Sequence, residues 1–277
     1  MTEMPSAVLS IDFESFGHTP AYRGASGSIP DPEDVGPGTM ERLLSTLDSQ
    51  DADATFFVVS EVAQRHPERI VAAAEAGHEI ASHTHTHPLL TDCTPEQRRE
   101  ELVRSREVLQ SVTGADVDGF RAPAFDFGDD HFQLLADAGY TYDSSVAPCR
   151  SIPGWYGGEW DVHEPTPAPV LREGAPESLT ELPIAVMPGL GLPLTGTWIR
   201  FFGVRYTLLG MKLLARRGIT PVLYVHPWEL ANLPSVEGVP KRVYVRTGAW
   251  MWRAIGRILA SDFAFVTARE VVEASDE

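Results

Sequence analysis

The residues best suited to chemistry lie between Gly77 and Pro88, where the chain reads Gly-His-Glu-Ile-Ala-Ser-His-Thr-His-Thr-His-Pro. His83 and His87 follow a short apolar run that is typical of a strand, and their spacing lets both imidazoles turn toward one point. Neutral imidazole is the commonest metal ligand in proteins, so two of them in one turn could form half of a zinc site. Considered alone, the same spacing also fits a solvated polar turn.

Polar clusters follow four other apolar runs of the chain. Asp12 and Glu14 lie two residues apart and can face the same way, so that one binds a metal and the other accepts a proton; they could equally cap a loop. Arg121 offers a rigid fork that can orient a carboxylate, or it forms an ordinary salt bridge. Asp143 could orient a histidine or cap the following turn. His226 ends an apolar strand before Pro-Trp-Glu and could be catalytic or a satisfied core histidine.

These clusters must be positioned by the elements that precede them. Apolar runs bounded by turn residues alternate with stretches of helical period, which predicts a parallel sheet with helices outside, as a barrel or a doubly wound sheet. Active sites of such sheets lie at the carboxyl ends of the strands. The predicted strands are residues 7–11, 54–59, 78–82, 117–120, 140–142, 181–184 and 221–225, and the predicted helices are 61–76, 94–112, 129–138 and 204–216.

Length and composition favour a single large domain. The chain has 277 residues, of which 43% are hydrophobic, and it has no apolar run of the roughly 18 residues that a membrane span needs. Residues 1–6 lack the pattern of a secretory signal, so we expect a cytoplasmic protein. Two cysteines, Cys93 and Cys149, cannot form a disulfide framework and lack a second thiol at metal spacing.

The charge balance is strongly acidic. The formal net charge is -17, and the only lysines are Lys212 and Lys241. An acidic surface repels nucleic acid and anionic lipid, so we expect neither as a partner and no insertion into a membrane. An acidic, lysine-poor surface also resembles that of halophilic proteins adapted to a high-salt cytoplasm.

The order of the clusters resembles that of the polysaccharide deacetylases of the NodB-homology group, carbohydrate esterase family 4. The chain also resembles a narrower subgroup of this family, the deacetylases found with exopolysaccharide and exosortase loci. It shares their His-Pro-Trp-Glu sequence, and its tail, residues 246–271, resembles theirs. Two departures are a first motif that reads Asp-Phe-Glu in place of Asp-Asp, and a fourth motif without its Asp-Trp ending. The motifs correspond, in order, to Asp12 with Glu14, to His83 through His87, to Arg121 through Phe125, to Asp143, and to Leu223 through His226.

The resemblance implies a fold and a domain plan. The fold is a distorted (β/α)7 barrel of the polysaccharide deacetylase type, within the α/β class. Residues 1–277 would form one catalytic domain. An irregular insertion at about residues 148–197 would lie on the rim of the barrel, and a C-terminal extension would begin at about residue 227.

The resemblance also implies a metal-dependent hydrolase that removes N-acetyl groups from the amino sugars of a glycan or glycan precursor. The ion would be zinc or, alternatively, nickel, cobalt or manganese. Which acid binds it is left open by the departure in the first motif. By this resemblance Glu14, His83 and His87 would be the metal ligands. Asp12 would be the catalytic base and Arg121 its partner. His226 would be the catalytic acid, and Asp143 would raise the pKa of His226.

Further residues are candidates for the substrate side of the site, and His85, between the two ligands, should point away from the metal. An N-acetylated sugar or a nucleotide- or lipid-linked glycan precursor is the expected partner, and the oligomeric state is open. One alternative is a hydrolase of cyclic amides and imides of the allantoinase-like branch; another is a glycan-binding protein without catalysis. The substrate-side candidates are Pro123, Phe125, Arg200, Trp228 and Glu229, and stacking or ordinary packing is expected of Trp155, Tyr156, Trp160, Trp198 and Trp228.

Overall fold

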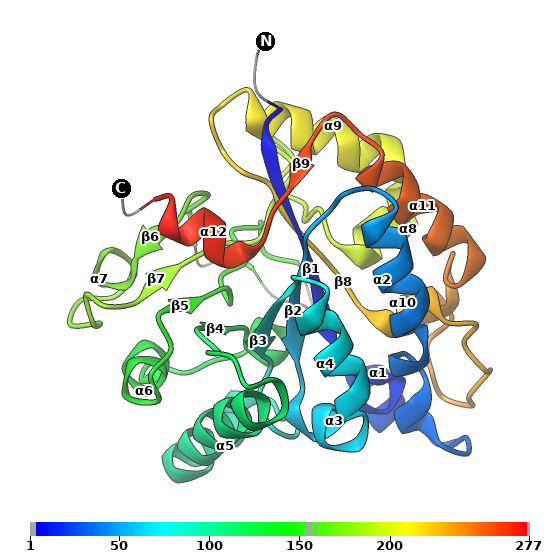
Figure 1. The fold of residues 1–277 in the computed structure, drawn as a ribbon, viewed down its shortest axis with the longest axis horizontal. Helices are drawn as coiled ribbons and strands as arrows, with labels where there is room; N and C mark the ends of the chain where they lie inside the picture. Colours follow the sequence, from blue (N-terminus) through cyan, green and yellow to red (C-terminus); the bar gives the residue numbers. More distant parts are fainter. Residues whose placement is uncertain (1–3, 153–156, 159, 276–277) are drawn as a thin grey trace.

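The computed structural model describes residues 4–152, 157–158 and 160–275, and its centre is one curled sheet (Figure 1). The strands in chain order are β1 (Ser6–Phe13), β2 (Thr55–Val58), β3 (Glu79–Ser82), β4 (Gly119–Phe120), β5 (Tyr142–Asp143), β6 (Thr166–Pro167), β7 (Thr180–Glu181), β8 (Val222–Val225) and β9 (Ala264–Phe265). Their order in the sheet is β6-β7-β5-β4-β3-β2-β1-β8, and β9 pairs with β1. Every pairing is parallel except that of β6 with β7.

Seven of these strands run in parallel around a distorted barrel. The pairing proceeds from β8 through β1, β2, β3, β4 and β5 to β7. The chain that follows β7 closes the ring, because the Ala185 N–H donates a hydrogen bond of 2.8 Å to the Val222 carbonyl of β8. The expected α/β fold with a distorted (β/α)7 barrel is therefore confirmed, and β6 and β9 are additions to it.

Helices surround the barrel (Figure 1). They are α1 (Pro20–Arg23), α2 (Met40–Asp48), α3 (Ser60–Arg65), α4 (Pro67–Glu75), α5 (Pro95–Thr113), α6 (His131–Asp137), α7 (Ala168–Leu171), α8 (Gly196–Phe202), α9 (Val204–Ala215), α10 (Pro227–Leu230), α11 (Ala249–Leu259) and α12 (Ala268–Glu273). Short 3-10 turns join several of them at Phe16–His18, Pro32–Asp34, Pro37–Thr39, Leu90–Asp92, Pro123–Phe125 and Lys241–Tyr244.

Local sequence explains where these helices begin and end. The predicted start of α5 is confirmed, since the Thr94 hydroxyl accepts the Gln97 N–H and the Gln97 side chain accepts the Thr94 N–H. The prediction of one helix over residues 61–76 was wrong, because the structure has α3 and α4 there. Pro67 lacks an N–H and its ring displaces the preceding backbone, so the helix stops at His66 and a new one begins.

Alternation along β1 decides which side chains reach the barrel interior. Leu9 and Ile11 point outward into the large core beneath the helices. Val8 points inward and joins a separate cluster inside the barrel. Because side chains on a strand alternate between its two faces, Ser10 and Asp12 share the inward face with Val8.

The region after β5 is less regular, as the sequence predicts, but it contributes β7 to the barrel and α8 to its rim. Beyond residue 227, α11 places Met251 and Ile255 in the same core as the barrel helices. The division into a rim insertion and a C-terminal extension stays a prediction. Cys93 and Cys149 are both free thiols. Among the described helices, none has the length and apolar character that spanning a bilayer requires.

Candidate metal centre and active site

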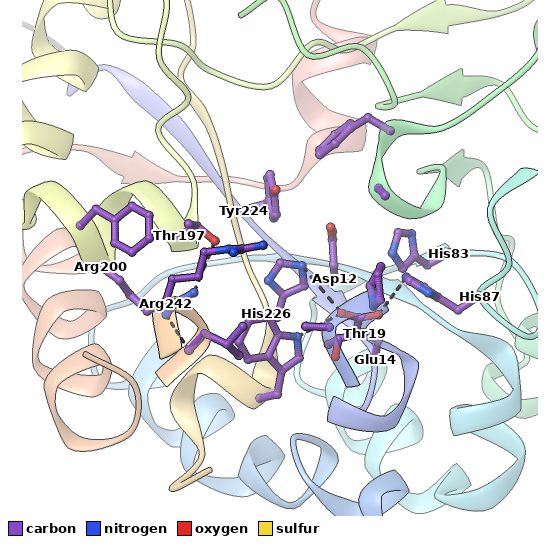
Figure 2. Close-up of a pocket in the computed structure, with 17 residues that line it drawn as sticks. Asp12, Glu14, Thr19, His83, His87, Thr197, Arg200, Tyr224, His226 and Arg242 are labelled. Carbon is purple, nitrogen blue, oxygen red and sulfur yellow. Dashed lines mark hydrogen bonds and ion pairs between the residues drawn. The ribbon is translucent and has the colours of Figure 1, made fainter. Parts of the chain in front are cut away.

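The side chains predicted to do chemistry meet at the carboxyl end of the barrel. Asp12 and Glu14 come from the end of β1, His83 follows β3, Arg121 follows β4 and His226 follows β8. Parallel strands in a barrel end at the same rim, so residues far apart in sequence converge there. Figure 2 shows His83 and His87 on one side of Glu14 and His226 on the other.

Glu14, His83 and His87 form a group that could hold a metal ion. Each offers one ligand atom, these atoms all lie within 4.8 Å of one another, and all three residues are buried. The loop between the histidines turns sharply, with positive φ angles at Thr84 (65°) and His87 (59°). The Thr84 hydroxyl accepts the His87 N–H at 3.0 Å and so holds the turn that brings the second imidazole back to the first.

The protonation of His83 suits a metal ligand. Its Nδ1 lies 2.7 Å from the carbonyl oxygen of Arg121. A carbonyl only accepts, so Nδ1 carries the proton and Nε2 keeps a free lone pair. Burial, only partly opposed by the charge of Asp12, lowers the pKa of His83 to about 4. The ring is therefore neutral at pH 7, the state in which imidazole binds a cation.

Glu14 presents one free carboxylate oxygen to the two imidazoles. Its Oε1 accepts a hydrogen bond of 3.0 Å from Trp228 Nε1. Its Oε2 lies 2.8 Å from His87 Nε2 yet has no hydrogen bond of good geometry. Burial raises the pKa of Glu14, but the positive charges of His87 and His226 are the main causes that bring it well below its ordinary value. A buried anionic oxygen facing two imidazole nitrogens fits a divalent cation.

Asp12 and Arg121 form a buried ion pair beside this group. Arg121 NH1 donates to Asp12 Oδ1 at 2.6 Å and to the Ser10 hydroxyl at 2.7 Å. Its Nε and NH2 donate to the carbonyl and hydroxyl oxygens of Ser144 at 3.0 and 2.8 Å. The guanidinium also lies 4.0 Å above the ring of Phe57. Arg121 is fully buried and every arm is held, so it fixes the orientation of the Asp12 carboxylate.

His226 is held by Glu229. Glu229 Oε2 lies 3.3 Å from His226 Nδ1 and accepts the backbone N–H of His226 at 3.0 Å. The imidazole stacks on Trp228, with ring centroids 5.0 Å apart. Burial lowers the pKa of His226, but the hydrogen bond and charge of Glu229, together with the charges of Glu14 and Asp12, raise it by more, so the net direction is upward.

The carboxylate of Glu229 is itself fixed by Arg200. Arg200 Nε donates to Glu229 Oε1 at 2.7 Å, and both side chains are buried. Arg200 NH1 also donates to the carbonyls of Val243 and Val245, each at 2.9 Å. Gly196, the first residue of α8, lies against this carboxylate, and any side chain there would collide with it. Arg200 and Glu229, which were both predicted to bind substrate, therefore form an ion pair behind His226.

Asp143, predicted to orient His226, is placed elsewhere. Its Oδ2 lies 2.8 Å from His131 Nε2 on α6, and its Oδ1 accepts the Ser145 hydroxyl at 2.5 Å. The reason is the alternation of β5. Tyr142 occupies the inward face with the barrel cluster, so Asp143 points outward toward the helices. Glu229 occupies the position at His226 that we had expected for Asp143.

The other sequence candidates divide between the site and the packing around it. Phe125 and Trp228 line the cavity, Pro123 is buried behind it, and Arg200 reaches its wall. His85 turns away to Ser60, whose hydroxyl lies 2.7 Å from its Nδ1. The remaining aromatic candidates are Trp160, which stacks on Phe127, and Trp198, which stacks on Phe202, whereas Trp155 and Tyr156 lie outside the described residues.

A cavity of about 270 Å³ joins these groups, and several of its residues were not predicted. Ser10 is not part of the lining, but it binds Arg121 and could have been found, because it alternates with Asp12 on β1. Thr197 lies in the same segment as the predicted Arg200, which points to it, whereas Arg242 lies in the 3-10 helix Lys241–Tyr244, for which the sequence gives no signal. The lining consists of Asp12, Glu14, Thr19, Pro20, Ala21, His83, His87, Ala124, Phe125, Thr197, Arg200, Phe201, Tyr224, His226, Trp228, Arg242 and Val243 (Figure 2).

Comparison with known proteins matches two family models to adjacent parts of the chain. Residues 32–142 match the polysaccharide deacetylase model, and residues 144–273 match a domain of unknown function, DUF3473. A peptidoglycan deacetylase of Helicobacter pylori is 27% identical over 131 residues, covering 45% of this chain and 45% of the relative. A chitooligosaccharide deacetylase of Sinorhizobium fredii is 35% identical over 98 residues, covering 35% of this chain and 46% of the relative. The matches thus span less than half of either relative.

A solved structure agrees with the whole fold. The crystal structure of a candidate polysaccharide deacetylase from Mycobacterium smegmatis superimposes with a TM-score of 0.63 at 25% identity, and the match covers 99% of this chain and 96% of that one. The two family models together account for residues 32–273 apart from residue 143. The chain therefore carries a polysaccharide deacetylase (NodB-homology) domain over residues 32–142, followed by a DUF3473 region over residues 144–273.

Proposed function

We propose that this protein is a metal-dependent hydrolase that removes N-acetyl groups from the amino sugars of a glycan or glycan precursor. One observation carries the proposal. Three metal-ligand atoms, a carboxylate held by an arginine and a histidine held by a glutamate all face the same cavity. Such a set supplies a cation, a proton acceptor and a proton donor within reach of one substrate, which is what amide hydrolysis needs.

Glu14, His83 and His87 would hold the ion. Zinc suits two imidazoles and one carboxylate, with nickel, cobalt and manganese as alternatives. A bound divalent ion lowers the pKa of water from 15.7 to about 7 and polarises a carbonyl oxygen. Glu14 is the better ligand of the two acids, because its Oε2 is free and faces the imidazoles, whereas Asp12 is engaged by Arg121.

Asp12 would take the proton of the attacking water. Arg121 binds only its Oδ1, so Oδ2 is left to accept a proton. The fixed guanidinium keeps the carboxylate in one orientation at the wall of the cavity. Asp12 therefore serves as the general base, and Arg121 is its positioning residue.

His226 would protonate the departing amine, which is a poor leaving group unless protonated. Glu229 binds its Nδ1 and leaves Nε2 to face the cavity from the side opposite His83 and His87 (Figure 2). The charge of Glu229 favours the protonated ring, the form that a proton donor requires. The role first assigned to Asp143 thus passes to Glu229, fixed in turn by Arg200.

The walls of the cavity suit a sugar. Tyr224, Phe125 and Phe201 offer aromatic faces, and Thr197 and Arg242 offer polar groups. The activities named for the two relatives, on peptidoglycan and chitooligosaccharides, support N-acetylated sugars as the substrate class. The cytoplasmic location also stays a prediction, which cell fractionation tests.

The decisive experiment measures metal content and acetate release together. Purified protein is incubated with zinc and assayed on N-acetylchitooligosaccharides and peptidoglycan fragments. His83→Ala should lose both metal and activity, whereas His226→Ala should keep the metal and lose about 10²–10⁴-fold in turnover. His85→Ala, two residues from a ligand but turned away from it, is the matched control and should keep both. Full metal occupancy in His83→Ala would contradict the ligand assignment.

The same preparation separates the alternative functions. Ring opening of a hydantoin or cyclic imide without acetate release would identify the allantoinase-like branch. Glycan binding by a protein that takes up none of zinc, nickel, cobalt or manganese would identify a binding protein without catalysis.

A further inference from the structure

The charges of this chain are segregated along its length. Segment 196–260 holds ten of the 22 Lys and Arg residues but only two of the 39 Asp and Glu residues. Its net charge is therefore +8, while the rest of the chain carries -25. The expectation that an anionic surface is repelled assumed an even distribution, and this segment does not fit that assumption.

The exposed side of α9 combines cations with an apolar side chain. Arg205, Leu209, Lys212 and Arg216 follow one another at intervals of four, three and four residues, which places them on one face of the helix. All four are exposed, and Leu209 keeps 54% of its surface accessible. Phe202, at the end of α8, is 52% exposed just before this face begins.

The neighbouring helix extends the same basic surface. α11 packs against α9 and exposes Arg253 and Arg257 on its outer side, and both helices lie at the upper right of Figure 1. Arg246, in the loop before α11, lies 5.1 Å above the ring of Trp250. We call this surface the basic face; it consists of Phe202, Arg205, Leu209, Lys212, Arg216, Arg246, Arg253 and Arg257.

Most of these cations have no acidic partner. Within the part of the chain that the structure describes, Lys212 alone among them has a carboxylate within 4.0 Å, that of Asp262. Like charges that lie close together repel one another. A cluster of unpaired cations in an otherwise acidic protein therefore indicates an anionic partner. Two large apolar side chains, Phe202 and Leu209, stand exposed among the cations.

We propose that the basic face binds the surface of an anionic lipid bilayer. Basic helices with exposed Phe and Leu lie in the interface of such membranes, with the cations at the headgroups and the apolar side chains inserted among them. Each Lys or Arg near an anionic surface contributes about fivefold to partitioning. The acidic remainder of the molecule is repelled by the same surface, which fixes the orientation of the bound protein.

A bilayer fits better than a soluble polyanion. A nucleic acid or an anionic polysaccharide would use the cations but offers no place for Phe202 and Leu209. The position of the face relative to the cavity also supports a membrane, because Phe201 lines the cavity and Phe202, the next residue, lies on the basic face. Where the proposed function holds, this arrangement favours a lipid-linked glycan as substrate; membrane binding itself does not depend on that function.

The test is co-sedimentation with vesicles of phosphatidylcholine, with and without phosphatidylglycerol. We expect binding only to vesicles that contain phosphatidylglycerol. Arg205→Glu with Lys212→Glu should weaken it by about 30-fold or more, since two attractive charges become repulsive. The matched control is Arg99→Glu with Arg104→Glu, which makes the same change of charge at exposed positions of α5, far from the basic face in Figure 1.

A second variant separates the lipid from other polyanions. At about 1 M salt the Debye length falls to about 3 Å, so the attraction between charges is screened and the remaining vesicle binding is apolar. Phe202→Ser with Leu209→Ser should lose this salt-resistant binding. Circular dichroism checks that each variant is folded. The proposal is overturned if the protein ignores anionic vesicles, if the α5 control weakens binding equally, or if heparin binds as tightly as vesicles and the serine variant changes nothing.

Discussion

The replacement Glu229→Gln tests the reassignment of the group that supports His226. The amide keeps the shape of the side chain and one oxygen acceptor but removes the negative charge. Glu229 is fully buried, with Arg200 Nε at 2.7 Å and His226 Nδ1 at 3.3 Å. The variant therefore loses the charge that favours protonated His226 while the imidazole itself stays in place.

Two magnitudes follow from these contacts. A general acid contributes about 10²–10⁴-fold, or about 2.7–5.4 kcal/mol at 1.36 kcal/mol per tenfold. Glu229→Gln weakens the acid without removing it, so we expect a loss of about 10- to 100-fold in kcat, smaller than that of His226→Ala. Removing one partner of a buried ion pair costs about 3–5 kcal/mol of stability. The lower end applies, because Arg200 keeps its bonds to two backbone carbonyls.

The pH dependence gives the sharper readout. Burial lowers the pKa of His226, while Glu229, Glu14 and Asp12 together raise it by more, with Glu229 the largest of the three. Without the charge of Glu229 the pKa falls, so His226 loses its proton at a lower pH. Since the donor must be protonated, the alkaline limb of the kcat profile should move to lower pH in Glu229→Gln, with metal content unchanged.

Asp143→Asn is the matched control, because it also neutralises a buried carboxylate near a histidine. It should reduce stability through its contact with His131 and leave the pH profile of kcat where it is. If Asp143→Asn moves the alkaline limb and Glu229→Gln does not, the reassignment is refuted. Measurements of kcat against pH and of urea unfolding on all three proteins decide the question.

Two further predictions concern buried charges. Arg121→Lys should lower kcat by about 10- to 100-fold with little change in KM. One ammonium group cannot replace a guanidinium whose hydrogen bonds contribute about 1.5–3 kcal/mol each. Assays of acetate release and zinc content check this prediction. Glu181 is buried and its pKa lies well above its ordinary value, chiefly through burial and then the charge of Asp143, so it costs stability as pH rises above its unfolded pKa. At pH 8 the free energy of unfolding of Glu181→Gln should therefore exceed that of the wild type by on the order of 1 kcal/mol, so that the variant unfolds at a higher urea concentration. This gain in stability should vanish below pH 4.5.

Much of the fold could be predicted from sequence because its signals are local. Apolar runs ending in turn residues located the barrel strands, and the capping residues Thr94 and Gln97 located the start of α5. The two-residue strands β4 and β5 were found only as parts of longer apolar runs. Helix α11 was missed, although its apolar face is buried in the main core, because the tail that contains it was interpreted by its resemblance to a subgroup and not by its helical period.

The sequence predicted which residues form the site but not which of them contact one another. Each motif follows a strand, and strand ends converge in a barrel, so the convergence of Asp12, His83 and His226 follows from their positions. Partners depend on which face of a strand a residue occupies. One residue of register on β5 decides that Asp143 faces α6, and no local signal in its motif shows this.

The two matched regions form one site together with the end of β1, which precedes them and supplies Asp12 and Glu14. The deacetylase model covers His83, His87 and Arg121, whereas His226 and Glu229 belong to the DUF3473 region. The regions also share one barrel through β1, which precedes both of them: β1 pairs with β2 of the first region and with β8 of the second, along four residues each. Removing the second region would therefore take away His226, the proposed proton donor, and would also expose the edge of β1. The DUF3473 region supplies β7 and β8 of the seven barrel strands together with the proposed proton donor, so we expect that neither matched region folds or catalyses alone.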